Sequence, residues 1–97
     1  MQPQPHFDWD AKKDLANQVK HGVSFEFAQL AFLDAQRVIL ADEKHGAVEQ
    51  RFYCIGKIGR GVLTVRFTTR KNIIRIFGAG YWRKGKHIYE KQNQVHG

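Results

Sequence analysis

The chain has 97 residues, the length of one small domain, and leaves no room for a second hydrophobic core. Hydrophobic residues make up 42% of it and charged residues 26%, which is typical of a globular protein rather than of a disordered or fibrous one. Its apolar runs are only a few residues long, which excludes a membrane-spanning helix. We therefore expect residues 1–97 to form a single domain with no membrane contact.

Cysteine and histidine usage restricts the possible chemistry. Cys54 is the only cysteine, so neither an internal disulfide nor a zinc site built on paired cysteines is available. The histidines lack the spacing of a helical metal site, and we expect neither a metal nor a cofactor. The first residues show no basic segment followed by an apolar stretch, as a secretory signal would, so we expect a cytoplasmic protein.

The net charge of +7 is concentrated in one half of the chain. Residues 1–50 carry five Lys or Arg and eight Asp or Glu, whereas residues 51–97 carry eleven Lys or Arg and only one acidic residue, Glu90. A half-chain of this kind repels itself, and its usual partner is a polyanion. Nucleic acid is the commonest such partner, and an acidic protein surface is the second.

The elements expected in chain order are two helices, four strands and a helix, which is a small α+β domain. Residues 1–6 are expected to be frayed. Asp10 is a good N-cap for a helix over 11–21 that Gly22 ends, and Ser24 caps a second helix over 25–32. Strand patterns follow at 37–40, 50–58, 62–69 and 72–78, and a basic helix is expected from Tyr81 to about Gln94.

Two turns predict the strand register and therefore the two faces of the sheet. A turn at Gly59-Arg60 places Phe52 opposite Phe67 and Cys54 opposite Val65. A turn at Arg70-Lys71 places Phe67 opposite Ile74 and Val65 opposite Ile76. Both turns put the same apolar set on one face, where the two N-terminal helices would pack: Phe52, Cys54, Leu63, Val65, Phe67, Ile74 and Ile76.

The other face is predicted to be cationic and aromatic. In this register Tyr53 faces Arg66, and Arg66 faces Arg75. Two arginines directly opposite each other repel, and a bound anion reverses the sign because guanidinium groups bind phosphate bidentately. Nearby aromatic rings could stack an unpaired base. A solvated face with no ligand is the alternative interpretation.

Basic residues and a phenol are sufficient for RNA cleavage without a metal. The 2′-hydroxyl of the substrate attacks the adjacent phosphate, while the enzyme holds the geometry, stabilises the extra negative charge and assists proton transfer. Phosphate-binding loops of the GK[ST] type, HExxH and GxSxG motifs are absent from the sequence, and Cys54 is expected in the core rather than at an active site.

The sequence also resembles a known family. Phe7-Asp8-Trp9-Asp10, Lys13, Asn17 and Lys20-His21-Gly22-Val23-Ser24-Phe25 closely resemble the signature of BrnT-type toxins. Later landmarks of that family follow in order over the rest of residues 7–90: Asp42, Glu49, Arg51, Ile55-Gly56, Thr68, Arg70, Arg75-Ile76 and Tyr89-Glu90.

The resemblance implies a RelE-like fold and the toxin of a type II toxin–antitoxin pair, which cuts RNA and stops translation. It also implies a BrnA-type ribbon-helix-helix antitoxin that masks the toxin and represses the shared operon. In that complex only the antitoxin contacts operator DNA, and a dimeric antitoxin holds the two toxins in a heterotetramer. The chain departs from the family at Gly78-Ala79-Gly80, where members commonly have a serine-alanine-arginine stretch.

The candidate site combines the basic face with this resemblance. The catalytic candidates are Arg66, Arg75 and Arg83, as phosphate or transition-state contacts, and Tyr53. The RNA-binding candidates are Arg51, Thr68, Arg70, Tyr81, Trp82, Lys84, Lys86, Tyr89, Lys20 and His21. For Lys20 and His21 a structural role is a good alternative, because cations in the last turn of a helix complement its dipole and need no substrate.

Three functions are consistent with the sequence. The first is a metal-independent endoribonuclease toxin. The second is a catalytically silent module that anchors a repressor complex with its antitoxin, which the missing arginine at residues 78–80 favours. The third, direct binding of duplex DNA, ranks last because no recognition-helix motif is present.

Overall fold

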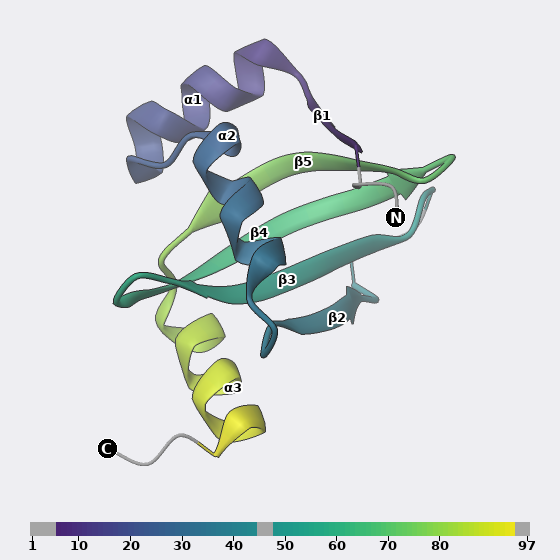
Figure 1. The fold of residues 1–97 in the computed structure, drawn as a ribbon. Coiled ribbons are helices and arrows are strands. Elements are labelled where there is room, and N and C mark those ends of the chain that lie inside the picture. The colour runs from purple at the N-terminus through teal and green to yellow at the C-terminus, as the bar shows by residue number, and fades with distance from the viewer. Residues whose placement is uncertain (1–5, 45–47, 95–97) are drawn as a thin grey trace, which may run out of the picture.

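The structure, a computed structural model, describes residues 6–44 and 48–94. Over these residues it is a five-stranded mixed sheet in the order β1-β5-β4-β3-β2 with helices on both sides (Figure 1). The elements are β1 (His6–Trp9), α1 (Ala11–His21), α2 (Phe25–Ala28), the 3₁₀ helix η1 (Gln29–Leu33), β2 (Val38–Asp42), β3 (Arg51–Ile58), β4 (Gly61–Arg70), β5 (Ile73–Gly80) and α3 (Arg83–Asn93). No helix in the described residues combines the length and hydropathy needed to cross a bilayer.

The predicted ends of the first helix are confirmed by its caps. The Asp10 carboxylate accepts hydrogen bonds from the backbone N–H groups of Lys12 and Lys13, at 2.8 and 3.2 Å. Gly22 ends the helix in the left-handed conformation, with φ of 69°. Ser24 caps α2 by accepting from the N–H of Phe27 at 3.0 Å. These local signals therefore fix the helix boundaries, as expected from the sequence.

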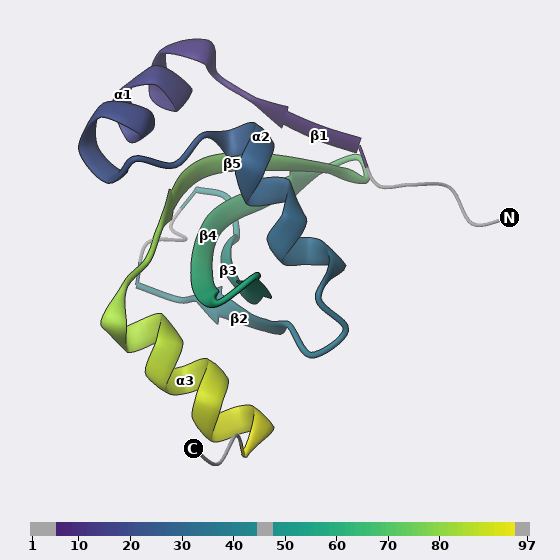
Figure 2. The ribbon, with the colours of Figure 1, turned by 60° about the vertical axis from the view of Figure 1, so that its left-hand side comes forward.

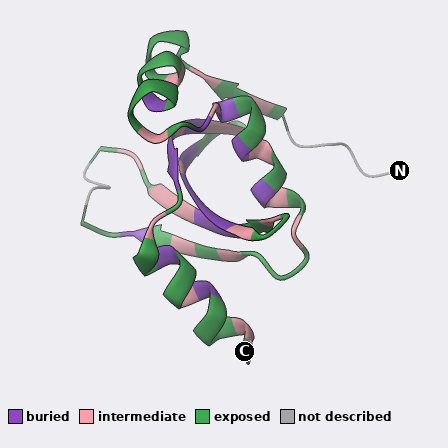
Figure 3. Cartoon of the chain, turned by 90° about the vertical axis from the view of Figure 1, so that its left-hand side faces the viewer, coloured by how far each residue is buried: buried purple, intermediate pink, exposed green. Residues whose placement is uncertain are grey.

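The core lies between the sheet and the short helices. Alternate residues of β3, β4 and β5 form what we call the core face, and α1, α2 and η1 cover it. The buried cluster there is Val23, Phe25, Ala28, Ala31, Cys54, Leu63, Val65, Phe67, Ile76 and Ala79. Strand β4 is strongly bent (Figure 2), and buried residues line the strands and the side of α2 and η1 that faces them (Figure 3).

Gly56 allows η1 to approach the sheet closely. A Cβ at this position would lie 2.2 Å from the carbonyl oxygen of Ala31 in η1. Any other residue would push η1 away from β3, so the glycine is required by the packing.

The predicted register is confirmed for β3–β4 and wrong for β4–β5. Phe52 lies opposite Phe67, as expected, but Phe67 lies opposite Ile76 rather than Ile74. The turn is at Lys71-Asn72, both with positive φ (49° and 68°), instead of at Arg70-Lys71. The pairing is shifted by two residues from Phe67 to Arg70 and, beyond the bulge, by three residues from Thr64 to Arg66. The even shift keeps Ile74 and Ile76 on their predicted face, and the whole predicted apolar set lies in or against the buried cluster, so the assignment of the core face is confirmed.

Two further predictions about the fold need correction. The sheet has five strands and is mixed rather than four-stranded, because His6–Trp9, with His6 expected to be frayed, pairs in parallel with Ile73–Ile76 of β5. The rest of the expected frayed end, residues 1–5, lies outside the described residues. The second helix has only four α-helical residues, Phe25–Ala28, and continues as the 3₁₀ helix η1.

Helix α3 packs on the opposite side of the sheet, which we call the open face. Its Tyr89 is buried with Ile55 and Val62 of the sheet, and the Tyr89 hydroxyl donates to Asp34 Oδ2 at 2.6 Å. Gly85 lies directly over Thr64, since a Cβ there would be 1.9 Å from Thr64 Oγ1. Figures 1 and 2 show α3 extending from the end of β5 on the side away from α1 and α2. It covers only one end of the open face.

Candidate functional site

The open face carries a cleft between the sheet and α3, which we call the main cleft. It has a volume of about 820 Å³. Strands β2, β3 and β4 contribute its floor, and the start of α3 contributes one wall. Its lining is Leu40, Ala41, Tyr53, Ile55, Thr64, Arg66, Trp82, Lys84, Gly85 and Ile88. It therefore combines apolar and aromatic surface with two cations and no carboxylate, a lining that suits an anionic aromatic ligand.

Arg66 is the central cation of this cleft. Its guanidinium carbon lies 5.0 Å from the centre of the Phe77 ring, and its aliphatic part passes over Gly78, where a Cβ would be 3.2 Å from Arg66 Cδ. Within the described residues, the buried Nε of Arg66 has no hydrogen-bond partner. A buried donor without a partner costs on the order of 1–3 kcal/mol, which a bound anion would recover.

Tyr53 lies directly opposite Arg66 across the β3–β4 ladder. Its hydroxyl donates to Asp42 Oδ2 at 3.1 Å. Burial and the hydrogen bond to the Asp42 carboxylate raise the pKa of Tyr53, although Arg66 opposes this. The phenol therefore keeps its proton at neutral pH, so it can donate a proton but is a poor base.

Arg51 lines a second site, which we call the smaller pocket. Its guanidinium carbon lies 4.9 Å from the centre of the same Phe77 ring. The pocket has a volume of about 210 Å³ and is lined by Asp10, Lys13, Glu49, Arg51, Thr68, Arg70, Arg75, Ile76 and Phe77. The two sites therefore meet at Phe77, with one arginine from each stacked on its ring.

The predicted pairing of Arg66 with Arg75 is wrong. Arg66 lies opposite Gly78 and Arg75 lies opposite Thr68, because of the shifted turn and a bulge beside Arg66 and Phe67. Arg75 instead forms an ion pair with Asp8, its neighbour on β1. The arginines that converge are Arg66 and Arg51.

The other predicted residues of the strands are partly committed to the protein itself. Arg70 donates two hydrogen bonds to the Glu49 carboxylate, at 3.0 and 3.1 Å. Thr68 is buried and donates to the carbonyl oxygen of Gln50 at 2.7 Å. Both residues shape the smaller pocket, but their donor groups already have partners.

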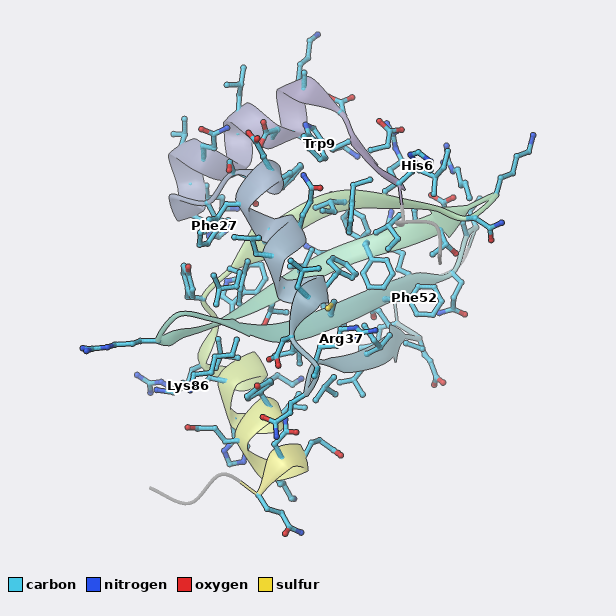
Figure 4. All side chains as sticks on the ribbon, in the orientation of Figure 1. His6, Trp9, Phe27, Arg37, Phe52 and Lys86 are labelled. Atoms are coloured by element: carbon cyan, nitrogen blue, oxygen red, sulfur yellow. The ribbon has the colours of Figure 1, made fainter. Side chains whose placement is uncertain are left out.

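The predicted residues around α3 separate into three groups. Trp82 and Lys84 line the main cleft, whereas Arg83 and Lys86 are exposed on α3 outside that lining. Figure 4 labels Lys86 on α3. Tyr81 packs over Gly61, where a Cβ would be 2.7 Å from its ring. Tyr89 is only 3% exposed, and its hydroxyl is bonded to Asp34. The structure therefore places Tyr89 in the packing of α3 and not at the cleft.

Of the two predicted residues at the end of α1, His21 lies beside the site and Lys20 does not. The His21 ring meets Trp82 edge-on with centroids 5.3 Å apart. Lys20 is exposed in the last turn of α1 and belongs to neither lining.

Two residues of the site were missed by sequence reasoning. Phe77 was not among the predicted site residues, and its contact with both arginines depends on the bulge in β5. Asp42 was noted only as a family landmark, although it is 6% exposed and accepts from Tyr53. Its place among those landmarks was the available signal.

The segment Gly78-Ala79-Gly80 is packed tightly beside the site. Ala79 is buried, and its N–H and C=O both bond to the Asn17 side chain, at 3.2 and 2.9 Å. A Cβ at Gly80 would be 2.8 Å from the Trp82 ring. A larger residue at position 80 would displace Trp82 from the wall of the main cleft, so the glycine is coupled to the shape of this cleft.

Comparison with known proteins identifies the family of the chain. A family model described as the ribonuclease toxin BrnT of type II toxin–antitoxin systems matches residues 9–85. None of the curated proteins matched the chain. The matched segment includes β3, β4 and β5 and the start of α3, and therefore most of the main cleft. The chain belongs to the BrnT family of ribonuclease toxins of type II toxin–antitoxin systems.

Proposed function

We propose that this chain is an endoribonuclease and that the main cleft is its active site. The observation that carries the proposal is the buried, unpartnered Nε of Arg66 beside the protonated hydroxyl of Tyr53, in a cleft without carboxylates in its lining. The Nε of Arg66 is already desolvated, while the half-buried side chain leaves the rest of the guanidinium group partly accessible to a phosphate. Membership of a ribonuclease toxin family supplies the class of reaction.

The proposed reaction uses the substrate as its own nucleophile. The 2′-hydroxyl oxygen forms a bond to the adjacent phosphorus and loses its proton to water, and the bond from phosphorus to the 5′-oxygen breaks. Arg66 binds the non-bridging oxygens, where negative charge increases in the transition state. In the proposed step the Tyr53 O–H turns from its hydrogen bond with Asp42 to the departing 5′-oxygen, donates its proton there and regains a proton from solvent. The products are a 2′,3′-cyclic phosphate and a 5′-hydroxyl.

The remaining parts of the site would position the substrate. Trp82 provides a flat ring at the wall of the cleft on which a base can stack, and Lys84 adds a second cation near the phosphate. The hydrogen bond from Tyr53 to Asp42 fixes the phenol relative to Arg66. This machinery needs no metal ion.

The proposal includes a partner and a cellular effect. A type II toxin requires an antitoxin, and we propose a ribbon-helix-helix protein that covers the open face, forms a heterotetramer with the toxin and contacts operator DNA itself. The excess of cations in residues 51–97 supports an acidic covering segment. Without that partner, cleavage of cytoplasmic RNA would stop translation.

A direct test uses purified protein, labelled single-stranded RNA and excess EDTA. We expect cleavage that leaves 2′,3′-cyclic phosphate ends, and no cleavage of the same oligonucleotide made with 2′-deoxyribose. Addition to a cell-free system should stop translation. RNA that stays intact at high protein concentration, with or without added divalent cations, would reject the proposal.

A second candidate function follows from the glycines at residues 78–80. Because this segment has no arginine, the chain could be a silent module that only anchors the repressor complex with its antitoxin. Substituting Arg66→Glu in the main cleft distinguishes the two functions. An enzyme would lose toxicity on expression, whereas a silent module would show no toxicity beforehand and would lose only affinity.

A further inference from the structure

The smaller pocket has the charge of a phosphate site. Four cations and two carboxylates line it, and both carboxylates are already engaged. Glu49 accepts two hydrogen bonds from Arg70, which lower the Glu49 pKa. The Asp10 carboxylate accepts from two backbone N–H groups at the start of α1, which lower its pKa as well.

Two cations of this pocket remain available. Within residues 6–44 and 48–94, neither Arg51 nor Lys13 forms an ion pair. Arg51 is half-buried in the sheet, and Lys13 is exposed on the first turn of α1. The two side chains come from different elements, β3 and α1, and line the same pocket of about 210 Å³. The group that this arrangement suits is small and anionic, such as a single phosphate.

Phe77 connects this pocket to the active site. Its ring holds the guanidinium groups of Arg51 and Arg66 at 4.9 and 5.0 Å, one in each lining. Both guanidinium groups therefore contact the same aromatic ring, and neither forms an ion pair within the described residues. The free protein gains little stability from such an arrangement, but two linked phosphates can be bound by the two arginines at the same time.

We propose that the smaller pocket binds the phosphate next to the one that is cleaved, so that the substrate is a single strand of RNA crossing Phe77 with two consecutive linkages. The inference rests on the proposed function, because it takes the main cleft as the place of cleavage. A single strand is required because a base must leave its stack to enter the main cleft beside Trp82. The backbone then continues over Phe77 to Arg51 and Lys13.

Binding of uncleavable oligonucleotides tests the proposal independently of catalysis. Fluorescein-labelled 2′-O-methyl RNA, which lacks the nucleophile, is titrated with the protein as a dinucleotide with one linkage and as a trinucleotide with two. We expect the second linkage to raise affinity about tenfold for the wild type, and this gain to disappear in Arg51→Ala. The slope of log affinity against log salt for the trinucleotide should fall by about 0.7.

Matched variants separate this effect from general loss of charge or structure. Arg60→Ala removes one arginine from the exposed β3–β4 turn, outside both linings, and should keep the tenfold gain. Lys13→Ala changes the pocket from the helix side, leaves the sheet intact and should reduce the gain. If Arg51→Ala perturbs folding, Lys13→Ala still decides the question.

The possible results distinguish failure of the inference from failure of the proposed function. If Arg51→Ala and Lys13→Ala keep the full gain while the wild type cleaves RNA, the smaller pocket is not a phosphate subsite but the active site stands. The inference is also overturned if Arg51→Ala weakens binding of the antitoxin and leaves oligonucleotide binding unchanged. A wild type that neither binds nor cleaves RNA overturns both.

Discussion

The core face and the open face are built from alternate residues of the same three strands, yet they differ in the polarity of their side chains and in how completely their polar groups are bonded. On the core face, Leu63 and Val65 are fully buried among apolar neighbours. On the open face, Arg66 keeps a buried N–H without a partner among the described residues, and two arginines share one ring. The core face stabilises the fold, whereas the open face retains unsatisfied groups that a ligand can use.

This difference predicts that stability and RNA cleavage respond to different substitutions. Removing apolar volume from the core face should lower the free energy of unfolding without changing the chemistry of the folded protein. Removing a cation from the open face should reduce RNA cleavage and leave the free energy of unfolding nearly unchanged. Substitutions at α3, which contacts the open face and forms a wall of the main cleft, should affect both.

The largest effect on stability is expected for Leu63→Ala. Leu63 is fully buried between the sheet and the short helices, and the truncation removes its apolar contacts and leaves a cavity. We expect a loss of about 2–5 kcal/mol in the free energy of unfolding, measured by urea denaturation. Cleavage per folded molecule should be unchanged. A loss below about 1 kcal/mol would contradict the assignment of this face as the core.

Arg66→Ala should produce the opposite pattern. Loss of the transition-state contact should lower kcat about 10²–10³-fold, measured with labelled RNA in single-turnover assays. The melting temperature should stay close to that of the wild type, because no carboxylate in the described residues loses an ion pair. Arg60→Ala is the control with the same change in charge. Equal activities of the two variants would show that Arg66 is not in the active site.

Gly85→Ala tests whether α3 couples the two properties. The added methyl group would lie 1.9 Å from Thr64 Oγ1, so the helix must move away from β4. We expect a loss of about 1–3 kcal/mol in stability together with reduced RNA binding, because α3 forms a wall of the main cleft.

A double variant that adds Thr64→Ala to Gly85→Ala provides the control for this clash. It removes the hydroxyl group, which has no hydrogen-bond partner within the described residues, and should recover part of both losses. If the double variant is no better than Gly85→Ala alone, the clash with Thr64 is not the cause.

The smallest effect is expected for Tyr89→Phe, and it should depend on pH. Burial and the hydrogen bond to Asp34 raise the pKa of Tyr89 from its ordinary value of 10.0 to about 12. The stabilisation is therefore fully present below pH 10 and is lost as the pH rises toward 12. Loss of this bond should cost about 1 kcal/mol at pH 7. The difference in melting temperature between the two proteins should shrink above pH 10, and a constant difference would contradict this account.

Asp34 should also make the stability of the protein depend on pH in the acidic range. Burial alone would raise its pKa, but the hydrogen bonds from Tyr89 and from the N–H groups of Lys57 and Gln36 outweigh burial and lower it. A lowered pKa contributes stability above the ordinary value of 3.8, and this contribution is lost as the pH falls below it. Asp34→Asn should therefore reduce the loss of stability between pH 5 and pH 2, measured by thermal melts.

The sequence was sufficient to predict the faces of the sheet but not its edges or its exact pairing. Alternation survives a shift of two residues, so the core face was correct even though the turn at Lys71-Asn72 was misplaced. The pairing of β1 with β5 joins segments more than sixty residues apart, and no local signal marks it. The convergence of Arg51 and Arg66 on Phe77 depends on the bulge, which the register prediction lacked.

The residues that reveal the family are mostly structural. Asp10 and Ser24 cap helices, Gly22 takes the left-handed conformation and Phe25 is fully buried. None of these four lines the main cleft, although Asp10 and the signature residue Lys13 line the smaller pocket. The signature therefore identifies mostly the scaffold, while the chemistry of the main cleft has to be argued from the strands that follow.

Asn17 does the work of a neighbouring strand where the described part of the sheet has none. Strand β1 pairs with β5 only as far as Ile76, so the backbone of Ala79 lies beyond the end of its neighbour. The Asn17 amide bonds to both the N–H and the C=O of Ala79, as the backbone of an adjacent strand would. Because Ala79 is fully buried, water could not replace these bonds. Loss of this amide would therefore leave a polar backbone pair stranded inside the core.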